Sequence, residues 1–412
     1  MENSSNMKIT PAGLFPEAWE IIQLGTKASV LRGGSPRPID SFLTNDPDGI
    51  NWIKIGDVAV GAKYIKQTEE KIIPEGAVRS RKVYAGDFLL SNSMSFGRPY
   101  ILQIDGCIHD GWLVIQEYYD TFETDYLYYA LNSGYVLEQY KSLAAGSSVL
   151  NLNKDIVKRV NVAVPSRSEQ KRIAEALSGI DNMIATLDEA IAKKRQIKEG
   201  LMQQLLTGKT RLPGFRGEWD EVTFKSIYKY AKEGGTPSTG VAEYYNPATV
   251  PFAKIEDLKD KYLTSVESYI SESGVEHSSA WVIPVDSVIL SNGATLGEVS
   301  INKIPTSTKQ GILGIILKEQ YSPEFVYYLF KGRVFRREME RVTTHGTMDC
   351  AYLKDLNTIP LTMPSLEEQE AIASVISSID KEVYSLESLR DKYSLIKQGM
   401  MQELLTGTIR LI

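Results

Sequence analysis

The sequence predicts an α+β protein in which two pseudo-symmetric, mixed α/β globular domains are separated by two long antiparallel helices that form a coiled coil. Three observations predict this class: an internal repeat, an apolar heptad pattern in the best-matching part of each copy, and short apolar runs mixed with aromatic helical segments. A chain of 412 residues is too long for one typical domain. Its hydrophobic fraction of 42% is enough to build packed cores.

The internal repeat is strongest in two segments that align without a gap at an offset of 199 residues. Residues 165–212 and 364–411 share 22 identities in 48 positions. Weaker matches continue upstream, where Gly33-Gly34-Ser35-Pro36 matches Gly234-Gly235-Thr236-Pro237. A repeat this long indicates a tandem of one domain-plus-helix unit and not a solenoid. The predicted boundaries are 1–164 for the first domain, 165–208 for the first helix, 209–363 for the second domain and 364–412 for the second helix.

Each repeated segment predicts a long helix with one apolar face. Apolar residues over 168–205 recur at alternating spacings of three and four, which is typical of helices that pair. Ser166 with Glu169 resembles a capping box at the start, and Gly208 supplies a stop. The residues expected to pair the helices are Ile173, Leu177, Ile180, Ile184, Leu187, Ile191, Leu205, Ile372, Ile376, Ile379, Val383, Leu386 and Leu404.

The alternative is that each helix packs only on its own domain. A helix of about 38 residues is about 57 Å long, and it would extend beyond a domain of this size. Pairing between the two copies is therefore favoured. The basic side chains of Lys194, Lys198, Arg390 and Lys397 also fall at seam positions, where they either reach solvent or face a partner.

The segments before each helix are expected to be mixed α/β. Short β-like runs occur at 98–104, 112–116, 282–290 and 312–317, and aromatic-rich helical segments occur at 125–140 and 324–337. The tyrosines and phenylalanines of these helical segments are expected in the cores, in preference to a role as platforms for nucleic-acid bases.

Composition limits the kinds of site that the chain can hold. The two cysteines, Cys107 and Cys350, are far apart and the three histidines are scattered, so neither a disulfide framework nor a metal site is expected. The chain has no run of about 18 apolar residues, and its first residues, MENSSNMKITPAG, lack an apolar signal stretch. These features predict a cytoplasmic protein that has no membrane partner.

No reaction motif is complete. The run 208–210, Gly-Lys-Thr, looks like the end of a phosphate loop, but that motif needs a glycine where Gln203 stands. His109 and Asp110 are adjacent in sequence and do not make a catalytic triad. We therefore expect a binding protein that is not an enzyme and that has no cofactor. A metal-dependent nuclease remains an alternative, because nuclease motifs are degenerate.

The repeated motif is specific in its combination. Each copy opens with P-S-x-x-E-Q-x-x-I and runs into a long helix that closes with L-L-T-G, and the first copy is followed by L-P-G-F and a tryptophan. The residues are Pro165, Ser166, Glu169, Gln170, Ile173, the runs 205–208 and 212–215, and Trp219. Over essentially the whole chain, this combination resembles the specificity (S) subunits of type I restriction–modification systems.

The resemblance implies a DNA reader that does no chemistry. Each globular domain would be a target-recognition domain for one half of a bipartite, asymmetric site in double-stranded DNA. The helices would fix the spacer between the two halves and dock two methyltransferase (M) subunits, and restriction/translocase (R) subunits would join that complex. Two alternatives remain open: the reader of a related restriction system with another partner enzyme, and a coiled-coil adaptor that joins two proteins without binding DNA.

Sequence readout requires side chains that reach base edges, and basic residues that hold the phosphates. In the first domain the candidate contacts are Arg32, Arg37, Arg79, Arg81, Lys82, Asn92, Ser93 and Arg98. In the second domain they are Lys254, Asn292, Thr295, Lys309, Gln310 and His345. The loops that follow Leu90-Ser91-Asn92 and Leu290-Ser291-Asn292 are favoured, because these equivalent loops differ in sequence. The alternative for each residue is an ordinary solvated surface group.

Charge weighs against this interpretation. The formal net charge is −6, and residues 1–164 and 213–363 each carry 16 basic and 19 acidic side chains. DNA-binding proteins usually carry a basic patch, although a sum over the chain hides the local distribution. We therefore expect the isolated chain to bind DNA weakly and the methyltransferase partners to supply much of the phosphate contact.

Overall fold

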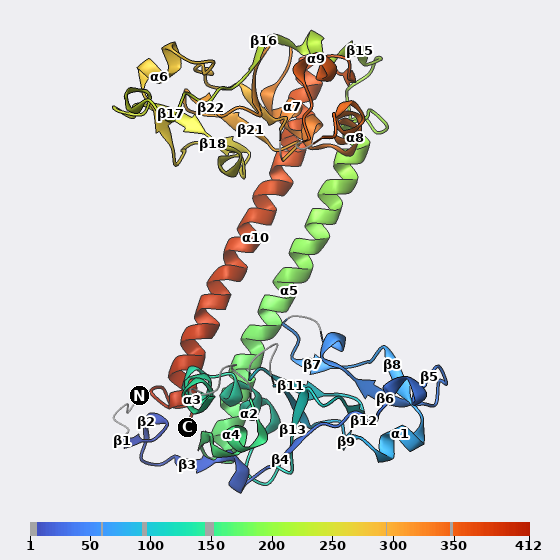
Figure 1. The fold of residues 1–412 in the computed structure, drawn as a ribbon, viewed down its shortest axis with the longest axis vertical. Coiled ribbons are helices and arrows are strands. Elements are labelled where there is room, and N and C mark those ends of the chain that lie inside the picture. The colour runs from blue at the N-terminus through green and yellow to red at the C-terminus, as the bar shows by residue number, and fades with distance from the viewer. Residues whose placement is uncertain (1–5, 59–60, 93–96, 145–151, 294, 347–348) are drawn as a thin grey trace. The chain divides into compact units, whose positions relative to one another are not determined.

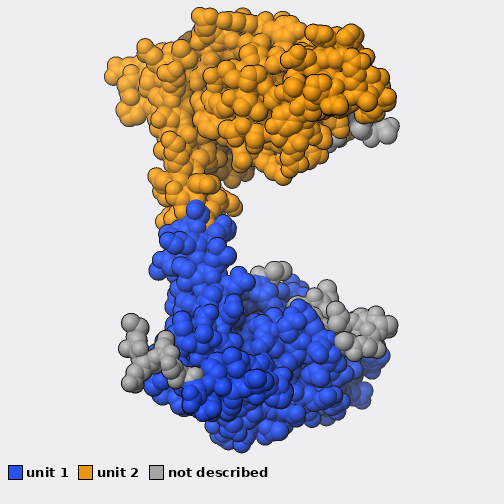
Figure 2. All heavy atoms as spheres, turned by 90° about the vertical axis from the view of Figure 1, so that its left-hand side faces the viewer, with its two compact units in different colours: residues 1–188, 388–412 blue, residues 189–387 orange. Residues whose placement is uncertain are grey.

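The computed structural model describes residues 6–58, 61–92, 97–144, 152–293, 295–346 and 349–412 (Figure 1). The chain divides into two compact units, which Figure 2 colours separately. Unit 1 comprises Met1–Asp188 with Ser388–Ile412, and unit 2 comprises Glu189–Glu387. The division falls inside both long helices, so each unit takes part of each helix. The boundaries predicted from the sequence differ from this division, because they lie at the ends of the helices and treat each helix as a separate segment.

Unit 1 contains two five-stranded sheets. The first has the order β4 (Ser29–Arg32), β13 (Trp112–Gln116), β10 (Phe88–Ser91), β11 (Pro99–Leu102) and β7 (Tyr64–Ile65). The second has the order β5 (Leu43–Thr44), β8 (Glu70–Ile72), β6 (Ile50–Ile53), β12 (Gly106–Ile108) and β9 (Arg81–Val83). Two further antiparallel pairs are β1 (Met7–Thr10) with β2 (Gly13–Pro16), and β3 (Glu20–Gln23) with β14 (Asn161–Val164). The helices are α1 (Pro74–Val78), α2 (Thr124–Leu131), α3 (Gly134–Ala144), α4 (Lys154–Arg159), the first part of α5 (Arg167–Leu205) and the last part of α10 (Leu366–Thr406).

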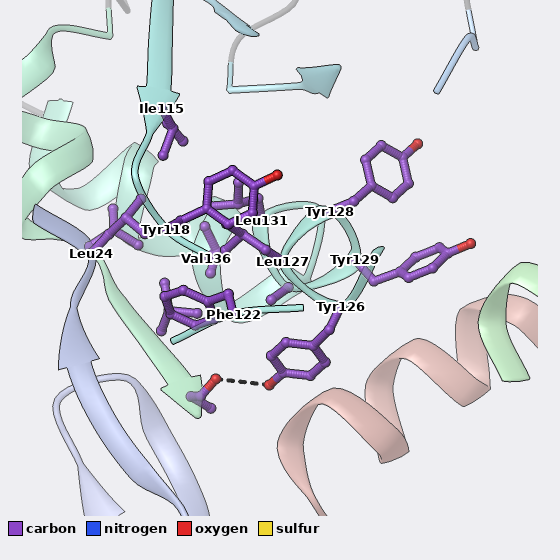
Figure 3. Close-up of a cluster of buried hydrophobic side chains, with 14 of the residues drawn as sticks. Leu24, Ile115, Tyr118, Phe122, Tyr126, Leu127, Tyr128, Tyr129, Leu131 and Val136 are labelled. Atoms are coloured by element: carbon purple, nitrogen blue, oxygen red, sulfur yellow. Dashed lines mark hydrogen bonds between the residues drawn. The ribbon is translucent and has the colours of Figure 1, made fainter. Parts of the chain in front are cut away.

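The first sheet of unit 1 lies between two apolar layers because side chains alternate along its strands. Phe88 and Leu90 of β10 pack with helices α2 to α4, whereas Leu89 faces the layer shared with the second sheet. Figure 3 shows part of the helix-side core, where the Tyr126 hydroxyl donates to the Ala163 carbonyl oxygen at 2.8 Å. The expectation that the aromatic residues of 125–140 lie in the core is confirmed for the fully buried Tyr126 and its neighbours on α2.

Unit 2 repeats this plan. Its main sheet has the order β16 (Tyr228–Glu233), β23 (Ile312–Leu317), β20 (Val288–Ser291), β21 (Val299–Asn302) and β18 (Tyr262–Leu263). A three-stranded sheet has the order β19 (Tyr269–Ile270), β17 (Val250–Ala253) and β22 (Ser307–Thr308), and β15 (Asp220–Thr223) pairs with β24 (Pro360–Met363). The helices are α6 (Glu272–Glu276), α7 (Pro323–Lys331), α8 (Arg333–Val342), α9 (Leu353–Leu356), the last part of α5 and the first part of α10 (Leu366–Thr406).

The predicted run 282–290 is a strand only at its end, where β20 begins at Val288. Ile283 forms an isolated bridge with Thr306. Asp286 between them has φ of 61°, a left-handed conformation that a strand does not tolerate.

Both long helices begin in the same way, through the Glu-Gln pair of the repeated motif. Gln170 donates to the carbonyl oxygens of Thr121 and Pro165 at 3.1 and 3.0 Å, which fixes the start of α5 to the globular part of unit 1. Gln369 makes the equivalent bonds at the start of α10. The motif therefore joins each helix to the domain that precedes it.

The expected capping box of α5 is only half formed. Ser166 Oγ accepts from the backbone N–H of Glu169 at 3.3 Å, as expected. The Glu169 carboxylate does not return to the helix start, because it pairs with Arg410 at 2.5 Å and accepts from Trp19 Nε1 at 3.1 Å. At the other end, Gly208 has φ of 67°, the left-handed conformation that ends a helix.

Within each unit, the two helix segments are joined by ion pairs and run antiparallel. In unit 1, Lys397 Nζ lies 2.5 Å from Asp181 Oδ1, and Arg390 lies 3.6 Å from Asp188. In unit 2, Lys198 pairs with Asp380 at 2.5 Å, and Lys194 pairs with Glu382. These four pairs involve the basic residues that the sequence placed at seam positions, and they show that the charged ends face the other helix.

Two of these carboxylates, those of Asp181 and Asp380, also accept a hydrogen bond from a tyrosine of the globular part. The Tyr129 hydroxyl donates to Asp181 Oδ2 at 2.7 Å in unit 1, and the Tyr328 hydroxyl donates to Asp380 Oδ2 at 2.7 Å in unit 2. Burial, and then the hydrogen bond to the aspartate, raise the pKa of Tyr129, so it stays protonated and acts as the donor. One aspartate in each unit thus connects its own helix, the other helix and a domain tyrosine.

The residues expected to pair the helices have two levels of burial. The buried ones are Ile173, Leu177, Leu187, Ile191, Leu205, Ile372, Ile376, Ile379 and Leu404. The half-buried ones are Ile180, Ile184, Val383 and Leu386. Ile173, Leu177 and Leu404 belong to the core of unit 1, and Leu205, Ile372 and Ile376 belong to the core of unit 2. The ends of the apolar stripe therefore pack on the globular parts.

Candidate nucleic-acid interface

One end of the first sheet gathers the predicted contact residues of unit 1. Arg32 ends β4 and pairs with the start of β13, and Leu90 near the end of β10 pairs with the start of β11. Asn92 and Arg98 follow and precede those strands, so they lie at the same end. Arg81 of strand β9 lies there as well. It pairs with Ile108, the last residue of β12, and its Nε donates to the Arg32 carbonyl oxygen.

Asp110 contacts two of these basic residues, and a third contacts the backbone of one of them. The Arg32 Nε donates to the Asp110 carbonyl oxygen at 3.2 Å, and the Arg81 Nε donates to the Arg32 carbonyl oxygen at 3.2 Å. Arg37 pairs with the Asp110 carboxylate at 3.4 Å, and Ser35 Oγ donates to it at 3.0 Å. The backbone and the carboxylate of Asp110 therefore bind two of the arginines, and Arg81 joins them through Arg32.

Asp110 and His109 were not among the predicted contacts. Burial alone would raise the pKa of Asp110, but the Ser35 hydrogen bond and the nearby His109 and Arg37 together lower it, so the carboxylate stays ionised. A hollow of about 390 Å³ opens beside these residues. Gly33 and Gly34, which match in the second repeat, donate to the carbonyl oxygens of Trp112 and Ile108 on either side of Asp110, and no local sequence pattern reports these long-range contacts.

The other basic candidates of unit 1 are also at the surface. Arg79, Arg81 and Lys82 are exposed, and Arg98 is half-buried. Their stems pack locally: the Arg79 guanidinium lies 5.3 Å from the ring centroid of Phe42. Within the described ranges, Arg37 is the one member of the set Arg32, Arg37, Arg79, Arg81, Lys82 and Arg98 that pairs with a carboxylate. Asn92 is half-buried, and Ser93 lies outside the described residues.

Unit 2 brings its candidates to the equivalent sheet end. Lys254, Thr295, Lys309, Gln310 and His345 are all exposed. The Lys309 N–H donates to the carbonyl oxygen of Ala253 at 3.0 Å, which sets the turn between β22 and β23 beside the end of β17. This surface carries fewer cations than its counterpart in unit 1.

Two of the unit 2 candidates have local structural bonds. Asn292 is fully buried and its Nδ2 donates to the Ala351 carbonyl oxygen at 3.1 Å, so its side chain holds the neighbouring loop and is not offered to DNA. We therefore leave Asn292 out of the proposed contact set. His345 Nδ1 lies 3.1 Å from Asp349 Oδ1, at the surface of that same loop.

The described residues contain no group of three or more His, Cys, Asp or Glu side chains placed to hold a metal ion. In the same part of the chain, no helix combines the length and the apolar character that crossing a membrane requires.

The sequence matches one family model twice. The model is the type I restriction modification DNA specificity domain, and the matches cover residues 16–199 and 216–393. The chain belongs to this family. Each DNA specificity domain match spans one globular part and most of the long helix that follows it, in agreement with the internal repeat.

Relatives and solved structures agree with this family. The type I restriction enzyme MjaVIII specificity subunit of Methanocaldococcus jannaschii is 25% identical over 96% of this chain and 94% of its own length. A chain from a structural study of complex assembly and conformational transition in the type I R-M system superposes with a TM-score of 0.64 at 17% identity, over 96% of this chain and 99% of that one. The S subunit of the type I restriction-modification system from M. genitalium gives 0.57 at 15% identity, over 98% of both chains. These two structures show that the fold is shared.

Proposed function

We propose that this chain is the DNA-recognition subunit of a type I restriction–modification complex. Each target-recognition domain reads one half of a bipartite, asymmetric site in double-stranded DNA. The chain itself does no chemistry: two methyltransferase subunits modify the target base, and restriction/translocase subunits join the same complex. The presence of two DNA specificity domains in one chain supports this role.

The observation that carries the proposal is the repeated sheet end. In both units the same strands, β4/β16, β10/β20 and β13/β23, close on the same turns, but the exposed side chains at that end differ. A shared scaffold with different exposed groups suits two readers of unlike half-sites, since direct readout depends on the donors and acceptors that reach base edges. An adaptor without DNA would have no need of such paired differences.

The two long helices are proposed to form an antiparallel coiled coil that fixes the spacing between the half-sites. The buried stripe at Leu187, Ile191 and Ile379 and the ion pairs between helix segments support pairing. Half-sites read from one face of a duplex have centres about 34 Å apart, or a multiple of that distance. The outward faces of the helices are left for the methyltransferase subunits.

Methylation mapping tests this function. The chain is co-expressed with the methyltransferase subunit of its own system, and methylated bases are located on genomic DNA. We expect a stable complex and methylation confined to one split, asymmetric motif. A complex that forms without motif-specific methylation would favour the adaptor.

A second measurement tests the weak binding that the acidic composition predicts for the isolated chain. Its affinity for the mapped motif is expected to be far lower than that of the assembled complex. Tight binding by the isolated chain, with a steep dependence on salt, would contradict the view that the partners supply much of the phosphate contact.

A further inference from the structure

We infer that the two sheet ends divide the work of DNA binding. Each unit still reads its own half-site, but unit 1 also holds backbone phosphates through a cluster of cations, whereas unit 2 relies mainly on apolar and uncharged polar side chains that contact base and sugar edges. This inference rests on the proposed function and adds the chemistry of each half-site contact.

Strand register identifies which residues of the two main sheets are equivalent, beginning with the residue that ends β4 in unit 1 and β16 in unit 2. Arg32 pairs with Leu113 in unit 1, and Glu233 pairs with Leu313 in unit 2. The residues that follow make matching bonds, since Gly33 donates to the Trp112 carbonyl oxygen and Gly234 donates to that of Ile312. A cation and an anion therefore occupy the same place on the two surfaces.

A second pair of positions follows from the neighbouring strands. Val83 pairs with Gly106 in unit 1, and Ile283 bridges Thr306 in unit 2. The two residues before each of these are exposed basic residues in unit 1 and apolar residues in unit 2. They are Arg81 and Lys82 in unit 1, and Trp281 and Val282 in unit 2.

Three more positions show the same loss of positive charge. They are equivalent because the glycine-rich turns, the segments around β9, and the starts of β11 and β21 align between the two units. The pairs are Arg37 with Ser238, Arg79 with Ser279, and Arg98 with Glu298. Six cations in unit 1 thus correspond to two anions and four uncharged residues in unit 2.

Total charge does not explain this difference, because 1–164 and 213–363 carry equal numbers of basic and acidic residues. The difference lies in where the charges are. In unit 2, Lys331 pairs with Glu298 at the sheet end at 3.1 Å, so this cation already has a carboxylate as its counter-ion. In unit 1 the cations gather at the sheet end, where phosphates can serve as their counter-ions.

Unit 2 instead exposes an apolar edge. Val282 is 42% exposed, and Tyr230 is 49% exposed and packs edge-on against Trp281 with ring centroids 5.3 Å apart. Apolar groups of this kind contact thymine methyl groups and sugar faces. Thr295 and Gln310, which are exposed in the loops at this sheet end, supply hydrogen-bonding groups. Such contacts discriminate sequence and release few counter-ions.

The test is the salt dependence of DNA binding by the assembled complex with its methyltransferase subunits. The probe is a duplex that carries the motif mapped by methylation, and a scrambled duplex is the reference. One variant combines Arg32→Gln with Arg81→Gln, and the matched variant in unit 2 combines Lys254→Gln with Lys309→Gln. Thermal melting of each complex checks that the variants fold.

The slope of log K against log salt falls by about 0.9 for each phosphate contact that is lost. The unit 1 variant is expected to reduce that slope by about 1.8, and the unit 2 variant by less than half as much. Val282→Ser, an exposed change in unit 2, should lower the affinity by the same factor at every salt concentration. It should also relax the motif in one half.

Equal reductions from the two paired variants, or a larger one from unit 2, would overturn the division of work. That result would leave the proposed function intact, provided the wild-type complex still prefers its motif. If the wild-type complex shows no preference for the motif over the scrambled duplex, the proposed function fails and this inference fails with it.

Discussion

Glu169 and Glu368 occupy equivalent places at the starts of the two long helices, yet their surroundings differ. The Glu169 carboxylate binds Arg410 and Trp19 Nε1, and the side chains of Glu169 and Arg410 are 2% and 13% exposed. The partner of Glu368 is Arg211, whose side chain is 26% exposed.

We predict that Glu169→Gln lowers the free energy of unfolding by about 3 kcal/mol, because it leaves the Arg410 charge buried without a counter-charge. Glu368→Gln should cost less, since water reaches Arg211 more easily. Chemical denaturation of both variants measures the difference. Equal costs would show that burial of the arginine does not set the energy.

The carboxyl group of Asp87 makes the stability of the fold depend on pH. Burial raises its pKa, although the Tyr84 N–H and Gln116 Nε2 donate to it. A carboxyl whose pKa is higher in the folded state stabilises the fold when protonated, and this contribution is lost as the pH rises above the ordinary carboxyl value.

Asp87→Asn removes that loss, so the variant should be more stable than the wild type at pH 7. Its advantage should shrink as the pH falls toward 4. Melting temperatures across this range measure the gap. A gap that stays constant with pH would show that Asp87 does not titrate in this range.

Single residues also mark how far the sequence could predict the site. The basic candidates of unit 1 converge because Gly33 and Gly34 anchor a turn that both repeats share. Asp110, which contacts Arg32 and Arg37, could not be chosen, since its contacts come from segments about 75 residues away. The burial of Asn292 depends on a loop near Ala351, and no local pattern reports that contact.

At the scale of elements, the ion pairs between helix segments fix which residues face each other. Lys397 and Asp181 in unit 1 are equivalent to Lys198 and Asp380 in unit 2. Both pairs are about two-thirds to three-quarters buried, so each stabilises more than an exposed surface pair does.

Lys397→Asp places two like charges together and should destabilise unit 1 by about 1 kcal/mol or more. The double variant Lys397→Asp with Asp181→Lys should recover part of that loss, because the attraction returns. A double-mutant cycle by denaturation measures the coupling. Additive effects of the two changes would show that the pair does not specify the register.

The elements themselves were predictable to different degrees. The long helices have a sustained heptad pattern and glycine stops, so the structure finds α5 at Arg167–Leu205, close to the predicted span. Strands of two residues, such as β5 and β7, have no period that a sequence can display. Their positions follow from pairing with distant strands.

At the scale of the whole molecule, the duplication explains why one chain can read an asymmetric site. Two copies of one scaffold provide two sheet ends, and independent divergence of their exposed residues makes the two half-sites unlike. The identical charge totals of the two domains conceal this divergence. The sheet end of unit 1 carries more cations than that of unit 2, and this difference appears only once the strands are aligned by register.

The most direct test of the central claim is a half-exchange followed by methylation mapping. The globular part of unit 1 is replaced by that of a relative with a different motif, and the chain is co-expressed with its methyltransferase subunit. The account predicts a new motif in which one half changes while the other half and the spacer stay the same. Changes in both halves, or an unchanged motif, would contradict the claim that each unit reads its own half-site.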